Sequence, residues 1–263
     1  MPRLLRIPLS GLAFIVFYSG AAVLAWVLLP IVRFRLRGLP AAEQRAQLDH
    51  FMMHAYRWAV GFMGALGLMR YRLPDLNQTR LPPAPWVIVA NHPSLLDVLF
   101  IKAALPGVTV LVKSVLFRAP SLRRIFEASG DFKGPSDEGR HFGATSVLDI
   151  FVERLEQGRS VLVFPEGTRS AAWRLHRFRR GGAEAALRAG VPILPLFVLS
   201  DPPTLKKGDK WYDMPREVPL FEVQVLAPIY PAGRDSREVT AEIRDLLAEK
   251  LEAARLAATQ RAR

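Results

Sequence analysis

The chain of 263 residues contains no cysteine, which excludes disulfide bonds, thiolate metal sites and a cysteine nucleophile. Its five histidines are scattered along the sequence, so we predict neither a metal site nor a cofactor. The Gly-x-Ser-x-Gly pentapeptide that presents the nucleophilic serine of many lipid hydrolases is also missing. Acidic residues are few, with 24 Asp and Glu against 36 Lys and Arg. The resulting net charge of +12 favours a polyanionic partner, either nucleic acid or an anionic membrane.

The N-terminal segment decides between these two partners. No charged side chain occurs from Ile7 to Val32, and a helix of that length, at about 1.5 Å per residue, exceeds the hydrocarbon thickness of about 30 Å. A secretory signal peptide usually has a shorter apolar core, of about 7–15 residues. We therefore predict that residues 1–37 are a membrane anchor and that the partner is an anionic membrane, with no nucleic acid. Three arginines that follow the apolar run favour a cytoplasmic location for the rest of the chain: Arg33, Arg35 and Arg37.

The next segment, residues 38–72, has the pattern of a second helix, from Glu43 to Met69. Its uncharged part, Trp58–Met69, is too short to cross a bilayer. We predict an interfacial or capping helix, and an ordinary core helix is an equal alternative. A linker rich in proline and polar residues follows. Residues 73–263 are predicted to form the catalytic domain.

Short apolar runs alternate with helical patterns in this domain. Five runs predict buried strands: Trp86–Ala90, Val108–Val112, Ser160–Phe164, Ile193–Val198 and Phe221–Leu226. Three segments between them predict helices: Ser94–Leu105, His141–Gln157 and Gly182–Ala189. The alternation predicts an α/β fold with a mostly parallel sheet flanked by helices. In such sheets, ligands bind beyond the carboxyl ends of the strands.

The first predicted strand ends directly in the heptapeptide NHPSLLD, residues 91–97. Pro93 favours an extended conformation at His92, which places the imidazole at the end of the strand. Ser94 is a candidate helix N-cap, and Asp97 follows it by three residues. Because side chains in a first helical turn lean back toward the N-terminus, Asp97 can approach either the Ser94 N–H or the His92 ring. A capping box and a catalytic pair are both consistent with this spacing.

A second polar motif, PEGTRS, follows the predicted strand Ser160–Phe164. Gly167 permits an unusual backbone angle, and Arg169 offers a planar guanidinium that is suited to phosphate. A surface turn with a solvated Glu166–Arg169 pair is the alternative. Both motifs leave the same edge of the predicted sheet, which favours one shared site.

Together, NHPSLLD, FPEGTRS about seventy residues later, and VPILPLF at 191–197 resemble the glycerolipid acyltransferase family, which includes the 1-acylglycerol-3-phosphate acyltransferases. The resemblance covers roughly Leu73 to Pro228. It implies an acyl thioester donor, either acyl-coenzyme A or acyl-carrier protein, and a lysophospholipid acceptor such as lysophosphatidic acid. It also implies that no metal is used. A membrane enzyme of this kind, with a cytoplasmic catalytic domain, is expected at a bacterial inner membrane.

The reaction requires a base, because a neutral hydroxyl is a poor nucleophile at pH 7. We interpret His92 as the general base and Asp97 as the group that orients it. Glu166, Gly167, Thr168 and Arg169 are predicted to bind the substrate, with the Arg169 guanidinium on the phosphate.

The family usually has a glycine-initiated block ending in a basic residue between the two motifs. Gly130–Pro135 is a poor match to it, so Lys133 and Lys113 are alternative phosphate contacts. This block and the Thr204–Pro215 stretch favour, as an alternative acceptor, an unusual bacterial lipid. Two further alternatives are a lipid esterase or thioesterase that uses His92, and a non-catalytic membrane-binding protein.

Overall fold

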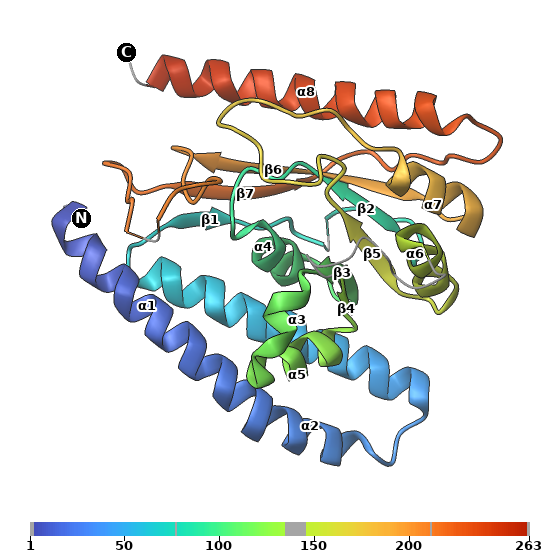
Figure 1. Cartoon of the computed structure of the whole chain (residues 1–263), viewed down its shortest axis with the longest axis horizontal. Coiled ribbons are helices and arrows are strands. Elements are labelled where there is room, and N and C mark those ends of the chain that lie inside the picture. The colour runs from blue at the N-terminus through green and yellow to red at the C-terminus, as the bar shows by residue number, and fades with distance from the viewer. Residues whose placement is uncertain (1–2, 77, 135–145, 211, 262–263) are drawn as a thin grey trace.

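The computed structural model describes residues 3–76, 78–134, 146–210 and 212–261 (Figure 1). Seven strands form one sheet in the order β1-β7-β6-β2-β5-β3-β4. Their bounds are β1 Arg70–Arg72, β2 Val87–Ala90, β3 Val108–Val112, β4 Phe132–Lys133, β5 Ser160–Val163, β6 Ile193–Asp201 and β7 Leu220–Val225. All neighbouring strands are parallel except β6 and β7. The predicted α/β fold with a mostly parallel sheet is confirmed.

The five predicted strands all occur, with ends within a few residues of the prediction. Strands β1 and β4 were not predicted, because Arg70–Arg72 has no apolar run and β4 has only two residues. Strand β1 pairs in parallel with β7. Residues 70–72, which we had grouped with the preceding helix, therefore belong to the sheet of the catalytic domain.

Helices cover both faces of the sheet (Figure 1). Their bounds are α3 Ala41–Ala65, α4 Asp97–Ala104, α5 Pro120–Ser129, α6 Val147–Glu156, α7 Gly181–Ala189 and α8 Ser236–Arg261, with a short 3-10 helix η2 at Ser114–Arg118. Helix α5 was not predicted. Helix α4 begins three residues later than predicted, and residues 141–145 of the predicted His141–Gln157 helix lie outside the described residues.

Strand β2 shows how the sheet builds two cores, since alternate side chains of a strand point to opposite faces. Val87 and Val89 join the core beneath α6, α7 and α8. Ile88 and Ala90 join the opposite core, against α3 and α4. All four residues of β2 are buried, so the strand that carries the first motif lies at the centre of the domain.

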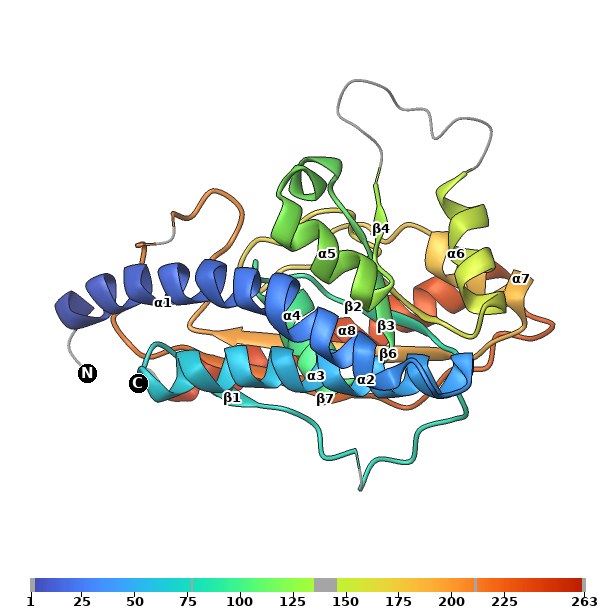
Figure 2. The same ribbon diagram turned by 90° about the horizontal axis from the view of Figure 1, so that it is seen from below.

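The N-terminal helix is continuous from α1 (Arg3–Val23) through a π-helical turn, η1 (Leu24–Leu28), into α2 (Leu29–Leu36). It lies beside α3 on the side of the sheet opposite to α8 (Figures 1 and 2). Residues 5–36 form a helix that is long and apolar enough to cross a membrane. Only 22% of its most apolar 18-residue stretch is buried inside the protein. A narrow stripe packs against α3 and α5 and includes Ala25 and Leu29. Most of the apolar surface of this helix therefore faces outward.

Arg6, near the start of this helix, is fully buried instead of flanking the apolar run in solvent. Its guanidinium donates to the carbonyl oxygens of Pro215, Arg216 and Glu217. These carbonyls belong to the long loop between β6 and β7. The N-terminal helix is thus attached to a loop of the catalytic domain as well as to α3 and α5.

Candidate active site

The first motif follows β2, whose neighbours are β5 and β6. After β2 the chain forms β3, β4 and β5, which all lie on one side of β2 in the sheet. It then crosses to β6, which lies on the other side of β2. The carboxyl end of β2 is therefore a topological switch point, where α/β sheets form their ligand crevices. His92 lies two residues beyond the end of this strand.

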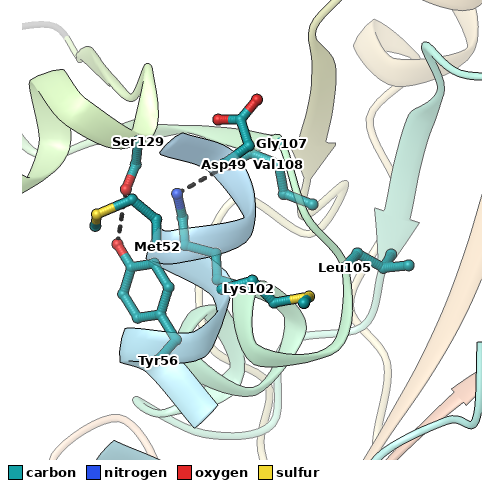
Figure 3. A pocket seen from close by; sticks show the side chains of 9 residues that line it. Asp49, Met52, Tyr56, Lys102, Leu105, Gly107, Val108 and Ser129 are labelled. Atoms are coloured by element: carbon teal, nitrogen blue, oxygen red, sulfur yellow. Dashed lines mark hydrogen bonds between the residues drawn. The ribbon is translucent and has the colours of Figure 1, made fainter. Parts of the chain in front are cut away.

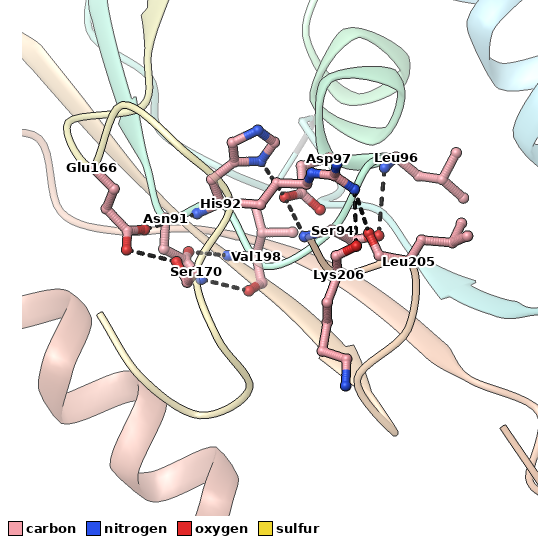
Figure 4. Close-up of polar contacts among 11 residues, drawn as sticks. Asn91, His92, Ser94, Leu96, Asp97, Glu166, Ser170, Val198, Leu205 and Lys206 are labelled. Carbon is pink, nitrogen blue, oxygen red and sulfur yellow. Dashed lines mark hydrogen bonds and ion pairs between the residues drawn. The ribbon is translucent and has the colours of Figure 1, made fainter. Parts of the chain in front are cut away.

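His92 and Asp97 form a direct pair. The Nδ1 atom of His92 lies 2.8 Å from Oδ2 of Asp97, and the same oxygen accepts a hydrogen bond of 2.8 Å from the Ser94 N–H. Figure 4 shows the imidazole and the Ser94 backbone converging on this carboxylate. Both contacts that the spacing allowed for Asp97, with the His92 ring and with the Ser94 N–H, therefore occur together.

Ser94 itself is not the helix N-cap that we predicted. Asp97 is the first residue of α4, and the N-cap residue is Leu96, with no side-chain cap. The Ser94 hydroxyl instead accepts a long hydrogen bond of 3.4 Å from the Leu96 N–H. The tight turn between β2 and α4, rather than a capping box, holds the carboxylate beneath the imidazole.

The environments of the two partners differ. Asp97 is fully buried, whereas the His92 side chain is 19% exposed. Burial raises the pKa of the Asp97 carboxyl, and the hydrogen bond from His92 counteracts this effect. Among the residues that the structure describes, none bonds to Nε2 of His92. One ring nitrogen is therefore held by a carboxylate, and the other is available to a substrate.

The second motif holds the backbone of His92. Oε1 of Glu166 accepts a hydrogen bond of 3.1 Å from the His92 N–H, and the Ser170 N–H donates to the His92 carbonyl oxygen at 2.8 Å. The other oxygen of Glu166 accepts from the Ser170 hydroxyl and from the His176 N–H. Glu166 is buried and holds the turn that carries His92, beside Ser170 (Figure 4). Its described hydrogen bonds include none to Arg169.

Arg169 is half-buried beside the same pair, where its charge lowers the pKa of Asp97. Its Nη1 atom donates to the carbonyl oxygens of Leu205 and Lys206, at 2.9 and 3.1 Å. Leu205 has a left-handed backbone, with φ of 54°, and its carbonyl also accepts from the Leu95 N–H. In the described part of the chain, Nη2 and Nε of Arg169 have no hydrogen-bond partner. One edge of the guanidinium thus holds the β6–β7 loop, and the other edge remains available.

Gly167 and Thr168 shape the turn between these residues. Gly167 has φ of +70°, and a side chain there would come within 3.3 Å of the Arg179 guanidinium. The backbone angle therefore favours glycine, and a side chain there would also crowd the Arg179 guanidinium. Thr168 is half-buried.

The two candidate lysines lie at a neighbouring part of the same edge. Lys133 on β4 is next to Val112 of β3 in the sheet register, and Lys113 directly follows Val112. Both lysines are exposed. Since neighbouring strands are about 4.8 Å apart, Lys113 lies about two strand spacings from β2 and Lys133 about three. Lys113 is the better placed of the two to approach a ligand at His92.

Two positioning residues were missed in the sequence. The side-chain amide of Asn91 exchanges two hydrogen bonds with the Val198 backbone, at 2.7 and 2.8 Å. It thereby continues the pairing of β2 with β6 up to His92. Phe164 stacks on the imidazole, with a centroid distance of 4.1 Å and an interplanar angle of 19°. Asn91 and Phe164 are the first residues of NHPSLLD and FPEGTRS, and this position was the available signal in the sequence.

A second buried polar cluster lies between α3, α4 and β3, away from the motifs (Figure 3). Lys102 donates to Asp131 at 2.7 Å and to the Val108 carbonyl at 2.9 Å. Tyr56 bonds to Ser129, and burial raises its pKa. The cavity at this cluster has a volume of about 10 Å³, which is barely enough for one water molecule. The cluster is closed to substrates of any size.

The first site is therefore an imidazole–carboxylate pair at the carboxyl end of the central strand of a mostly parallel α/β sheet. Comparisons with known proteins identify the family of the chain. Residues 75–199, which contain both motifs, match the protein family described as Acyltransferase. The 1-acyl-sn-glycerol-3-phosphate acyltransferase alpha of Mus musculus is 31% identical over 86% of this chain and 74% of its own length. The corresponding enzyme of Pseudomonas aeruginosa is 26% identical over 60% of each chain. With the human alpha enzyme, 31% identical, the match covers 55% of the relative.

A solved structure supports the fold independently. The 1-acyl-sn-glycerophosphate acyltransferase of Thermotoga maritima aligns with a TM-score of 0.75 at 20% identity, covering 95% of this chain and 98% of that one. The chain belongs to the family of the 1-acyl-sn-glycerol-3-phosphate acyltransferases. The family resemblance of the two motifs is thus confirmed.

Proposed function

We propose that this protein transfers a fatty-acyl group from an acyl thioester to the free hydroxyl of lysophosphatidic acid or a related lysophospholipid. The observation that carries the proposal is the orientation of the His92 ring. Its Nδ1 atom is bound to a buried carboxylate, and its Nε2 atom has no described partner. This is the arrangement of a general base that is held in one tautomer.

In the proposed reaction, Nε2 of His92 takes the proton of the acceptor hydroxyl as its oxygen attacks the thioester carbonyl. The imidazolium that forms is stabilised by Asp97. When the carbon–sulfur bond breaks, the proton passes from Nε2 to the leaving thiolate, and an ester and a free thiol result. No enzyme nucleophile is required, because the acceptor supplies the attacking oxygen. Both substrates must therefore be bound at the same time.

The packing around the His92 ring supports acyl transfer to a lipid hydroxyl rather than hydrolysis. Phe164 covers one face of the ring, and the β2–α4 turn and the second motif enclose its backbone. An apolar wall at the base restricts the approach of water, which competes with the acceptor hydroxyl.

Recognition of the acceptor phosphate is assigned to Arg169. Its unbonded edge presents Nη2 and Nε, a pair of donors that matches a phosphate oxygen pair. Lys113 and Lys133 are secondary candidates at the same sheet edge. Gly167 and Thr168 would shape the loop that presents Arg169, while Glu166 acts through the His92 backbone.

The N-terminal helix is proposed to hold the enzyme at a membrane. Large apolar side chains along it are exposed, among them Ile15 at 67%, Tyr18 at 58% and Phe34 at 67%. The same helix packs along the catalytic domain through α3 and α5. A helix that lies against the domain in this way fits an interfacial position in one leaflet better than a perpendicular span. The expected location is a bacterial inner membrane, with the catalytic domain in the cytoplasm.

The test is an acyl-transfer assay with the purified full-length protein, an acyl donor labelled in its acyl chain, and lysophosphatidic acid. We expect the label in phosphatidic acid. His92→Ala should lower kcat by about 10²–10⁴, the usual contribution of a positioned base. His54→Ala, at an exposed position on α3, is the control and should retain full activity.

Two results contradict the proposal. Label that appears as free fatty acid, with none in lipid, indicates a thioesterase or esterase. A His92→Ala variant that keeps most of the wild-type rate removes the imidazole from the mechanism.

A further inference from the structure

A basic groove lies between α8 and the loop that follows β5 and carries the second motif. It runs between residues 176–180, which follow the second motif, and the first turns of α8, and its volume is about 740 Å³. Small-molecule sites typically have volumes of about 300–1,000 Å³. Five arginines from the two elements line the groove: Arg177, Arg179, Arg180, Arg237 and Arg244.

The positive charge in this groove is largely unneutralised. In the described part of the chain, only Arg244 of these five arginines has a carboxylate partner, its neighbour Asp245 at 3.4 Å. The one carboxylate that lines the groove is Glu166. Both of its oxygens already accept hydrogen bonds, from the His92 N–H, the Ser170 hydroxyl and the His176 N–H. Five arginines gathered with so few acidic partners repel one another, and a bound polyanion relieves this repulsion.

The groove borders the active site. Glu166 joins the two, because its Oε1 atom accepts from the His92 N–H and its Oε2 atom accepts from the His176 N–H. Arg179, a groove residue, packs against Gly167 of the second motif. The groove therefore adjoins the backbone of His92 through Glu166, and the extended part of a ligand held in the groove would have to pass this carboxylate to meet the His92 ring.

The position of the groove argues against lipid headgroups as its ligand. Helix α8 covers one face of the sheet, and the apolar N-terminal helix lies beyond the other face (Figure 1). If the N-terminal helix lies against the bilayer, the groove opens away from the membrane surface. Its ligand is then supplied from the aqueous side.

We propose that this groove binds the phosphorylated nucleotide of coenzyme A and so holds the acyl donor. The inference rests on the proposed function, in which donor and acceptor are bound together. Both substrates are then anionic and repel each other at short range, so two separate cationic contacts favour their simultaneous binding. Arg169 serves the acceptor, which leaves the groove for the donor. A concave site of small-molecule size fits a nucleotide, whereas docking of a carrier protein typically buries about 800 Å² on each partner.

The test uses the double variant Arg237→Gln/Arg244→Gln in the full-length protein. Both side chains are exposed on α8, whose core contacts are made by Val239, Ile243 and Leu247. We expect the KM for acyl-coenzyme A to rise about 10-fold, equivalent to about 1.4 kcal/mol. The KM for lysophosphatidic acid and kcat at saturating donor should not change. Lys250→Gln/Arg255→Gln, at two exposed positions of the same helix outside the groove, also removes two positive charges and is the charge-matched control, which should behave as wild type.

A truncated donor identifies the part of the ligand that is recognised. An S-acyl-pantetheine keeps the thioester but lacks the nucleotide, so the double variant should use it as well as the wild type does. An equal penalty with S-acyl-pantetheine, a raised KM for lysophosphatidic acid, or a penalty that appears only with acyl-carrier protein overturns the proposal.

Direct binding separates failure of this inference from failure of the proposed function. Titration of coenzyme A into the wild-type protein in detergent micelles should show binding that the double variant weakens about 10-fold. If coenzyme A binds in this way but no donor supports acyl transfer, the groove assignment stands and the proposed function fails. If transfer occurs and the double variant has the wild-type affinity for coenzyme A, the groove assignment fails alone.

Discussion

Two buried carboxylates make contacts at opposite ends of α4 and differ in the groups that remain without a hydrogen bond: Asp97 is the first residue of the helix, and Asp131, between α5 and β4, bonds to Lys102 in its last turn. Asp97, at the start of the helix, bonds to His92, which is 19% exposed and has an available Nε2 atom. Asp131 bonds to Lys102, near the helix end, and these side chains are only 1% and 4% exposed. Burial raises the pKa of both carboxyls.

The two pairs differ in the polar atoms that they leave without a hydrogen bond. Oδ1 of Asp131 accepts from Lys102 and also from the Val110 N–H. Oδ1 of Asp97 is buried and has no hydrogen-bond partner among the described residues. The Lys102–Asp131 pair, in which Lys102 also donates to the Val108 carbonyl, holds helix α4 and strand β3 together. The His92–Asp97 pair leaves one ring nitrogen and one buried carboxylate oxygen without a described partner, and a buried polar atom without a partner is a common feature of functional sites.

Asp97→Asn tests the catalytic side of this comparison and should have the largest effect. The amide preserves the shape of the side chain but no longer fixes the tautomer or stabilises an imidazolium. In serine proteases the corresponding change costs about 10⁴ in kcat, and we expect a loss of at least about 10² here. Steady-state kinetics at saturating substrates measures it. Unchanged kcat would mean that Asp97 is only a structural residue of the turn.

Asp131→Ala tests the structural side. It leaves the Lys102 ammonium buried without its partner, so the free energy of unfolding should fall by about 3–5 kcal/mol. Activity per folded molecule should not change. Chemical denaturation monitored by circular dichroism measures the stability.

The double variant Lys102→Met/Asp131→Leu serves as its control. Because it removes both charges, it should recover much of the lost stability. If Asp131→Ala keeps the wild-type stability but loses turnover, the Lys102–Asp131 pair has a role in activity and not the structural role assigned to it here.

Arg169→Ala sharpens the comparison at the acceptor side and should have the smallest effect of the three. Loss of a charged hydrogen bond of about 1.5–3 kcal/mol should raise the KM for lysophosphatidic acid about 10–150-fold. Monoacylglycerol, which lacks the phosphate, is the control acceptor, and the variant should show no such penalty with it.

The equivalent penalty with monoacylglycerol would show that Arg169 acts through the loop carbonyls of Leu205 and Lys206 instead. Arg169→Lys should recover only part of the affinity, because an ammonium lacks the planar pair of donors.

Local patterns in the sequence were sufficient for the central part of the fold. The apolar runs predicted β2, β3, β5, β6 and β7, since buried strands in a parallel sheet must be apolar on both faces. Among the strands, the unexpected ones are those that tertiary contacts create. The short strand β1 exists because Arg70–Arg72 pairs with β7, and its composition alone does not favour a strand.

The candidate site shows the same division. The spacing of His92 and Asp97 allowed two hydrogen-bond partners for the carboxylate, and local geometry realises both of them. The role of Glu166 was not predictable. Its bond to the backbone of His92 joins residues that are 74 positions apart in the chain, and no short sequence window contains both of them.

The sequence by itself determined the long apolar N-terminal helix, the alternating α/β order and the two motifs, because each depends on residues that are neighbours in the chain. Only the tertiary structure decided which ends of Arg169 are engaged, that Arg6 is buried against the β6–β7 loop, and that arginines of residues 176–180 and of α8 form one groove. These features depend on groups that folding brings together from distant segments. Their spacing in the sequence therefore carries no record of their proximity.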